Sequence, residues 1–590
     1  SRDDEIKAPD LELNVLVGIQ DVTDEVNAAV KPGTSDSEAG TARRAKMAEI
    51  EKASTDRTGL RSDVVTLYQG GRYALYTYKK YTDIRLVMAP EFDIAFFGGD
   101  PDNFEYPRYD LDVCFFRAYE NDKPAQVKNY LRYSAKPLNE GDLIFVAGHP
   151  GRTSRLNTVA HLEYLRDIGF PFTLEMLRDR EAFLLDYSSK GKEQARQAKE
   201  ELFSYQNSRK ARLGGLGGLK DKSFMDRKRL AEVTIRRAIN ADPKRREIYG
   251  EPWRKIASAR KVAAELLVPY SYLERGFAFD SQLFGFARTL VRMNEELGKP
   301  NAERLREYRD SNLESLRQEL FSSAPIHPEL EEAKLAHSLE FWKKKVGEQD
   351  PNVKRVFQDK STAELAKQLV QGSKLIEVET RKQLANGGGQ TLSQSADPMI
   401  QLARAVDADA RAVRKRYEDE VESVETSQYA LIAKAKFEQE KDNVYPDATF
   451  TLRLAFGTVK GYEQDGKTIP PFTTMGGAFE HAEAHGNQPP YQLPRSWFDA
   501  KANGKLKLAT PLNFVSTADI IGGNSGSPVV NKDNEVVGLI FDGNIQSLVL
   551  DFGYEDRQAR AVSVDVRAIL EALTSIYGAE NLVRELTDRT

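Results

Sequence analysis

The sequence contains little cysteine and few histidines, and it has no long apolar run. Its one cysteine, Cys114, excludes an internal disulfide and a cysteine-cluster metal site. No stretch of about 18 consecutive apolar residues occurs, so no transmembrane helix is predicted. The 85 basic and 90 acidic residues give a formal charge of −5, which argues against a general nucleic-acid-binding protein because such proteins are usually basic.

Three regions of the 590-residue chain differ in character. Up to about residue 160, runs rich in tyrosine and β-branched residues are bounded by turn residues, which is typical of strands. A helix is predicted within this region at 41–54. From about 165 to 440, strong helix formers combine with apolar residues three or four apart, and strand-like runs resume near 442. This β–α–β order predicts a helical domain inserted between two parts of a β domain.

The segment GGNSG, residues 522–526, has the composition of a protease serine loop. Ser525 is the candidate nucleophile, and acyl transfer also needs backbone N–H groups aimed at the developing oxyanion. Gly523 permits a tight turn and offers one such N–H group, and Ser525 offers the other. Apolar strands flank the loop. The alternative is an ordinary hairpin loop, because glycine–serine turns are common.

An aspartate that could orient a catalytic base precedes the apolar run VCFF. Of Asp110 and Asp112, we choose Asp112 because it directly precedes this run, where trypsin-like proteases place the triad acid. Its role would be to hold the histidine tautomer and stabilise the imidazolium. The alternative is a turn aspartate that caps a strand.

None of the six histidines precedes Asp112, although the chymotrypsin order requires one there. His481 and His485 are four residues apart in HAEAH, which is not the H-E-x-x-H metal motif. Neighbouring glycines and prolines favour a loop with surface histidines, so no metal site is predicted. We expect the catalytic base to lie before Ser1.

Five segments, in order along the chain, carry a resemblance to a known family. They are FGGDPDNFEYPRYDLDVCFFRAY (97–119), GHPGRTSR (148–155), QNSRKARLGG (206–215), VYPDATFTLRLAFG (444–457) and GGNSGSPVVNKDNEVVGLIFDGN (522–544). Together they resemble the bacterial dipeptidyl-peptidase 7 and dipeptidyl-peptidase 11 family of serine exopeptidases, over essentially the whole chain.

The resemblance implies an α+β fold: a chymotrypsin-like double β-barrel with a large α-helical domain inserted in the second barrel. Residues 1–164 would form the first part of the catalytic domain, 165–441 the helical cap, and 442–590 the second part. The family removes dipeptides from the free N-terminus of peptides, in the periplasm or outside the cell, typically as homodimers. This chemistry needs no cofactor.

The same resemblance implies a site for the substrate's α-ammonium group. Asn103, Asn207 and Asp542 match the family's two asparagines and its aspartate, and a carboxylate with two amide oxygens suits an ammonium cation. Phe104 would form a wall for the peptide. The alternative for Asn103 is a structural turn in PDN.

Specificity for P1, the residue before the cleaved bond, is predicted from Gly543. The acidic-specific branch carries an arginine here, so glycine predicts an open, uncharged pocket that prefers apolar or bulky P1 residues. A cation elsewhere, such as Arg108, would change that prediction. Two other functions remain open: an endoprotease of the same fold, and a non-catalytic peptide-binding protein if no upstream histidine exists.

Overall fold

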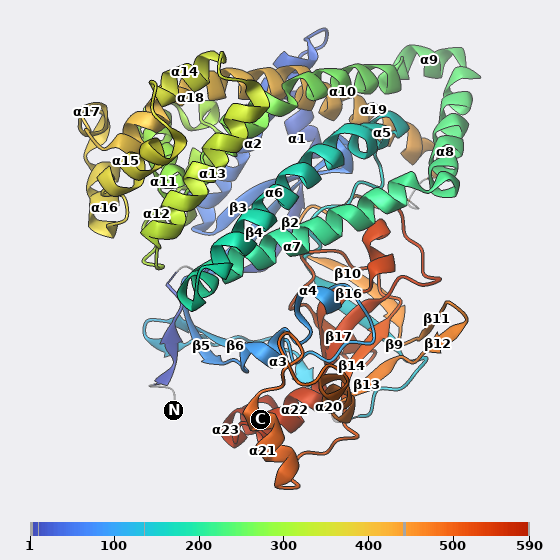
Figure 1. The fold of residues 1–590 in the computed structure, drawn as a ribbon. Helices are drawn as coiled ribbons and strands as arrows, with labels where there is room; N and C mark the ends of the chain where they lie inside the picture. Colours follow the sequence, from blue (N-terminus) through green and yellow to red (C-terminus); the bar gives the residue numbers. More distant parts are fainter. Residues whose placement is uncertain (1–3, 10, 135, 441–443, 588–590) are drawn as a thin grey trace.

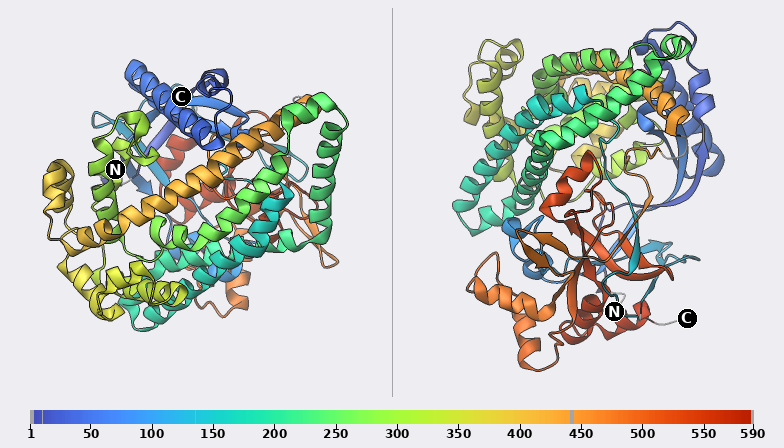
Figure 2. Two further views of the ribbon diagram at one scale, coloured as in Figure 1. Left: turned by 90° about the horizontal axis from the view of Figure 1, so that it is seen from above. Right: turned by 90° about the vertical axis from the view of Figure 1, so that its right-hand side faces the viewer.

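The computed structural model describes residues 4–9, 11–134, 136–440 and 444–587. Most helices gather in one thick layer, and the largest sheet lies beneath it (Figure 1). Figure 2 shows the helical layer from above and, from the side, the sheet below it. No helix within the described ranges is long and apolar enough to cross a membrane.

The largest sheet has eight strands and carries the serine loop. Its order is β10-β9-β15-β16-β17-β14-β13, and β8 pairs with β16. The bounds are β8 Arg132–Tyr133, β9 Leu143–Gly148, β10 Arg453–Thr458, β13 Phe472–Thr474, β14 Pro511–Ser516, β15 Pro528–Asn531, β16 Glu535–Gly543 and β17 Ala561–Asp565. Apolar residues of β9, β14, β15 and β16 form a buried cluster. Residues on both faces of β14 and β16 are largely buried, which explains why these two strands are nearly continuous apolar runs, whereas buried residues alternate with more exposed ones in β9.

The helical region begins and ends at neighbouring strands of this sheet. Strands β9 and β10 pair antiparallel, with Leu143 opposite Thr458 and Gly148 opposite Arg453. The chain from the start of α5 to the end of α19 runs between them. The first helix starts at Val159, a few residues before the expected 165. The boundary expected at 441–442 begins outside the described residues.

Two long antiparallel helices, α6 and α7, run along the side of the helical layer that faces the sheet (Figure 1). A single helical rod, formed by α18, η7 and α19, covers nearly all of the predicted helical segment 402–441, whose last residue is outside the described ranges. The bounds are α5 Val159–Tyr164, η3 Leu165–Gly169, α6 Phe170–Ser189, α7 Lys192–Lys220, α8 Lys222–Asn240, α9 Pro243–Tyr249, α10 Pro252–Pro269, η4 Tyr270–Glu274, α11 Gln282–Leu297, η5 Asn301–Glu303, η6 Arg306–Tyr308, α12 Leu313–Leu320, α13 Pro328–Val346, α14 Pro351–Phe357, α15 Thr362–Gly372, α16 Val378–Asn386, α17 Gly388–Ser393, α18 Pro398–Tyr417, η7 Glu418–Glu422 and α19 Ser423–Glu440.

Three smaller sheets complete the β structure, with orders β1-β5-β6-β7, β2-β4-β3 and β11-β12. The bounds are β1 Ile6–Lys7, β2 Leu13–Asp21, β3 Arg61–Leu67, β4 Arg72–Tyr81, β5 Asp83–Met88, β6 Phe115–Glu120, β7 Lys123–Pro124, β11 Tyr462–Gln464 and β12 Lys467–Ile469. The helix predicted at 41–54 lies within α2, Asp36–Thr58, which starts with a Ser35–Glu38 capping box and ends at left-handed Gly59. Remaining helices and 3₁₀ turns are α1 Thr23–Ala28, η2 Tyr68–Gly70, α3 Phe92–Ala95, α4 Gly99–Asp102, α20 Met475–Ala484, α21 Arg495–Ala502, η9 Ile545–Asp551, α22 Val566–Ser575 and α23 Glu580–Thr587.

The loop predicted around HAEAH is wrong, because His481 lies in α20 and His485 caps its end. The neighbouring glycines do not break this helix. Instead they permit close packing: a Cβ at Gly477 would lie 2.6 Å from the Tyr109 ring, and one at Gly476 would lie 3.1 Å from a backbone carbonyl. Glycine in a helix can serve close approach as well as termination.

Candidate active site

The serine loop turns sharply between β14 and β15. Gly523 and Gly526 have φ values of +103° and +83°, which glycine adopts without the steric penalty of other residues. Ser525 lies between them with an exposed side chain. Its Oγ donates a 3.3 Å hydrogen bond to the carbonyl of Phe541 on β16. The turn therefore presents the candidate nucleophile to solvent beside the end of β16.

The N–H groups of Gly523 and Ser525 are unused within the part of the chain that the structure describes. Their neighbours differ: the N–H of Gly526 donates to the Ile540 carbonyl at 2.7 Å, and that of Ser527 donates to the Asn524 carbonyl at 2.9 Å. Two free donors around an exposed serine are what stabilisation of an oxyanion requires.

Gly523 is held against the turn that follows β9. The N–H of Gly151 donates to the Gly522 carbonyl at 2.8 Å. A Cβ at Gly523 would lie 2.6 Å from both the Gly151 nitrogen and the His149 carbonyl oxygen, whereas a Cβ at Gly522 would meet nothing within 4 Å. The GHPG turn thus supports the serine loop through its backbone.

Gly523→Ala is expected to lower kcat/KM at least about 100-fold and to lower the melting temperature. The left-handed backbone strain of about 1–3 kcal/mol adds to a clash with backbone atoms, which cannot rotate away. Steady-state kinetics and thermal unfolding measure both effects. Gly522→Ala, one residue away in open space, is the control; equal behaviour of the two variants would contradict this account of the loop.

A second loop, which carries Asn103 and Phe104, approaches the end of β16. The N–H of Phe104 donates to Asp542 Oδ2 at 2.9 Å. Phe104 has a φ of +60°, an uncommon conformation for a bulky residue. Asn103, 5% exposed, donates through Nδ2 to Asn207 Oδ1 at 3.0 Å. The structure therefore brings together four residues predicted separately from three distant segments.

Helix α7 holds this second loop in place through Lys210, which lies one turn after Asn207. Lys210 Nζ donates to the carbonyls of Pro101 at 3.2 Å and of Asn103 at 3.0 Å, and also to that of Asp100. Three carbonyls converge on one ammonium group, so the helical region fixes the loop that carries Asn103.

Arg108 forms a buried bridge beneath the same loop. Its guanidinium, 2% exposed, donates to Asp542 Oδ2 at 2.6 Å, to Asp110 Oδ2 at 2.8 and 3.1 Å, and to the Asp102 carbonyl at 2.8 Å. Burial raises the pKa of the Asp542 carboxyl, and Arg108 opposes that rise by favouring the ionised form. Because Arg108 is ion-paired with two buried carboxylates, it stabilises the folded structure and is not a free cation for a substrate.

Asp112 and Asp110 occupy different surroundings. Asp110 is 1% exposed and is bound by Arg108, whereas the Asp112 side chain is exposed and has no hydrogen-bond partner among the described residues. Although part of Asp112 is exposed, desolvation by the surrounding protein raises the pKa of its carboxyl to about 6; the charge of Asp542 adds to this, and that of Arg108 opposes it. Of the two aspartates, Asp112 is the one free to bind another group.

The sequence profile of the Peptidase S46 family matches residues 1–588. The chain belongs to the Peptidase S46 family. This is a family of serine peptidases, which agrees with an exposed serine between two free N–H groups.

Known proteins are similar to this S46 peptidase along almost its whole length. The Asp/Glu-specific dipeptidyl-peptidase of Shewanella putrefaciens is 28% identical over 583 residues, covering 89% of this chain and 77% of that protein. Dipeptidyl-peptidase 7 of Capnocytophaga gingivalis is 25% identical over 624 residues, covering 99% and 84%. The structure of Porphyromonas endodontalis DPP11 with the dipeptide Arg-Asp has a TM-score of 0.79 at 23% identity, covering 99% and 86%, and shows the shared fold.

The open pocket predicted at Gly543 does not hold in the S46 peptidase. A Cβ there would lie 2.3 Å from Ser547 Oγ and 3.4 Å from the Arg560 carbonyl oxygen. Glycine therefore permits close packing of β16 against η9 and leaves no space for a ligand in that direction. The expected apolar or bulky P1 preference is also not supported by the comparisons, since the similar proteins include an Asp/Glu-specific dipeptidyl-peptidase as well as dipeptidyl-peptidase 7.

Sequence reasoning missed the residues that support the second loop. Asp102 accepts a hydrogen bond from the Tyr491 hydroxyl at 3.1 Å, and its other carboxylate oxygen is 3.0 Å from His481 Nε2. The HAEAH pair was the available signal, but its partner lies 379 residues away. No group of three or more metal-ligating side chains occurs among the residues that the structure describes.

Proposed function

We propose that this chain is a serine exopeptidase that releases dipeptides from the free N-terminus of peptides through an acyl-enzyme intermediate. The observation that carries this proposal is that two consecutive residues of β16 bind the two loops. The carbonyl of Phe541 accepts a hydrogen bond from Ser525, and the carboxylate of Asp542 accepts one from the loop of Asn103. An ammonium anchor beside a nucleophile fixes how many residues fit between them. Named relatives that are dipeptidyl-peptidases support the same function.

The proposed roles follow from the geometry described above. Ser525 attacks the carbonyl, and the N–H groups of Gly523 and Ser525 stabilise the oxyanion. Asp112 is the residue that would orient a catalytic histidine. Asp542 and the oxygens of Asn103 and Asn207 receive the substrate's ammonium group, and Phe104 borders the peptide.

We also propose the larger organisation implied by the resemblance. Residues 1–164 and 442–590 would form a chymotrypsin-like double barrel, and 165–441 would form a helical cap inserted in the second barrel. The antiparallel pairing of β9 with β10 supports this insertion. The protein would act in the periplasm or outside the cell as a homodimer.

For P1, we propose an acidic residue, which is supported by the name of the Shewanella putrefaciens relative. Position 543 provides no cation, and Arg108 is occupied by two aspartates. The recognising cation would therefore be a residue other than these two.

Four matched hexapeptides test this function, with glutamate or leucine at the second residue and with a free or acetylated N-terminus. The exopeptidase proposal predicts that free peptides release dipeptides, detected by mass spectrometry. Acetylated ones should be cleaved at least about 100-fold more slowly, because acetylation removes the ammonium charge and the N–H donors that Asp542 and the two asparagines would bind. Equal cleavage of free and acetylated peptides would instead indicate an endoprotease.

The same panel tests P1. Acidic specificity predicts at least about tenfold higher kcat/KM for glutamate than for leucine, and the reverse order would reject it while leaving dipeptide release intact. Binding of peptides without turnover, in the whole protein, would favour the non-catalytic alternative.

A further inference from the structure

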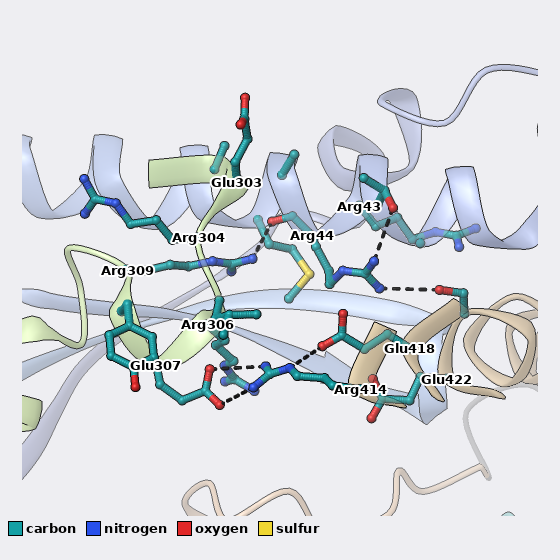
Figure 3. A pocket seen from close by; sticks show the side chains of 18 of the residues that line it. Arg43, Arg44, Glu303, Arg304, Arg306, Glu307, Arg309, Arg414, Glu418 and Glu422 are labelled. Atoms are coloured by element: carbon teal, nitrogen blue, oxygen red, sulfur yellow. Dashed lines mark hydrogen bonds and ion pairs between the residues drawn. The ribbon is translucent and has the colours of Figure 1, made fainter. Parts of the chain in front are cut away.

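A large cavity lies apart from the candidate active site, where α2 meets the helical region. Its volume is about 920 Å³, within the range of small-molecule sites. Residues of α2, η6, α18 and η7 line it, and none of them belongs to the serine loop or to the Asn103 loop. Figure 3 shows the side chains of α2 and Arg309 along one wall, and those of Arg306, Glu307, Arg414, Glu418 and Glu422 along the opposite wall.

The cavity has an excess of positive charge that comes entirely from arginine. Among the described residues, nine arginines and five glutamates line it, and there is no lysine. Some of this charge is neutralised within the protein: Arg414 binds Glu307 at 2.9 Å and Glu418 at 2.7 Å (Figure 3). Arg292 is similarly paired at 2.6 Å with Glu274.

Three other arginines around this cavity make no hydrogen bond to a described carboxylate. Arg44 donates to the hydroxyls of Thr41 at 3.2 Å and Ser423 at 3.4 Å, and no described carboxylate lies within ion-pair distance of it. Arg306 is exposed and makes neither a hydrogen bond nor an ion pair through its side chain within the described ranges. These two arginines retain donors for a ligand.

Arg309 is the buried member of this group. It is 4% exposed, and its Nε has no hydrogen-bond partner within the described part of the chain. Its Nη2 donates to the Arg44 carbonyl at 3.1 Å, and its nearest carboxylate, that of Glu51, is 3.6 Å away. Burial lowers the pKa of Arg309, the charge of Glu51 opposes that change, and the charges of Arg306 and Arg44 lower the pKa further. An anion in the cavity would relieve this crowding of like charges.

The residue types indicate the chemistry of the ligand. Guanidinium groups bind phosphate and carboxylate oxygens through paired donors, and they are favoured over lysine for such recognition. The volume exceeds what a single phosphate needs. Glu418 and Glu422 would repel an anion, so the ligand is expected to lie away from these two glutamates, between Arg306 on their side of the cavity and Arg44 and Arg309 on the other (Figure 3).

We propose that this cavity is a binding site for a small anion with two or more phosphate groups, held by Arg44, Arg306 and Arg309. Such a ligand would bind α2 and the helical region together, and it would stabilise the folded protein by mass action. The site is independent of the peptidase function, so either proposal can fail alone.

Isothermal titration of the whole protein with inorganic tripolyphosphate, at constant ionic strength, tests the proposal. We expect saturable binding to one site and a higher melting temperature than in sodium chloride of equal ionic strength. Arg306→Gln is expected to weaken binding about tenfold or more, because it removes a charge-assisted contact without breaking an ion pair of the protein. Arg317→Gln, an exposed arginine on α12 outside the cavity, should bind like the parent.

Absence of saturable binding by the parent, or equal weakening in Arg306→Gln and Arg317→Gln, would overturn the proposal. A titration with citrate tests whether the site prefers phosphate or carboxylate groups. Tripolyphosphate should bind at least tenfold more tightly than citrate, and equal or tighter binding of citrate would overturn the phosphate assignment. ATP in a parallel titration shows the source of the phosphates. Tighter binding of ATP would support a nucleotide, and equal binding would support a free polyphosphate.

Discussion

Replacing Ser525 by alanine is expected to lower kcat about 10⁴- to 10⁶-fold and to leave peptide affinity nearly unchanged. The serine hydroxyl forms the acyl-enzyme, and no other described hydroxyl lies between two free N–H donors on this loop. The ammonium contacts do not involve this side chain, so binding should persist. Steady-state kinetics on the whole protein gives kcat, and calorimetric titration of the inactive variant gives the dissociation constant.

A covalent serine reagent makes this test specific. Fluorophosphonate labelling of the parent should add one adduct, located at Ser525 by peptide mass spectrometry, and Ser525→Ala should remain unlabelled. Ser527→Ala is the matched control, because Ser527 belongs to the same loop but its side chain is buried and, unlike that of Ser525, makes no hydrogen bond to the Phe541 carbonyl. Residual turnover of Ser525→Ala within tenfold of the parent would exclude Ser525 as the nucleophile.

Asp542→Asn is expected to lower kcat/KM for peptides with a free N-terminus roughly 150-fold, which corresponds to about 3 kcal/mol of lost transition-state stabilisation. The substrate's ammonium group would then meet a neutral amide in a buried site, where the loss of an opposite charge has its greatest effect. Hydrolysis of acetylated peptides, already slow, should change little. The difference between the two peptide classes is therefore the informative measurement.

Because Asp542 also binds Arg108, the variant is expected to lose stability, and that effect needs its own control. Asp110→Asn removes the other carboxylate partner of Arg108 without removing an expected ammonium contact. Both variants should show lower melting temperatures, but only Asp542→Asn should lose the preference for free over acetylated peptides. Equal preferences in the two variants would assign Asp542 a purely structural role.

Several features were predictable from short segments because their causes are local. The apolar runs that became β14, β15 and β16 are largely buried on both faces, and the helix formers of 402–440 became one long rod. The positive φ values at Gly523 and Gly526 follow from the glycines of the motif itself. Local preferences and burial patterns agree in these segments, so the sequence was informative.

The failures arose where glycine had two possible meanings. Around HAEAH, glycines suggested a loop, but they serve close packing of α20 against Tyr109. At Gly543, glycine suggested an open pocket, but the missing side chain makes room for Ser547. Whether glycine marks a turn, a void or a close contact depends on which distant element lies against it, and a single sequence does not contain that information.

From its sequence alone, this protein was determined to be a β–α–β chain with a serine loop and an aspartate before an apolar strand, and the 590 residues hold no histidine ahead of that aspartate. Only the tertiary structure decided that Arg108 joins Asp110 to Asp542, that Lys210 fixes the Asn103 loop, and that arginines of α2 and η6 face one cavity. The reason is physical. The periodicity of strands and helices can be recognised from neighbouring residues, whereas the neutralisation of a buried charge such as Arg108 also depends on a partner hundreds of residues away, Asp542.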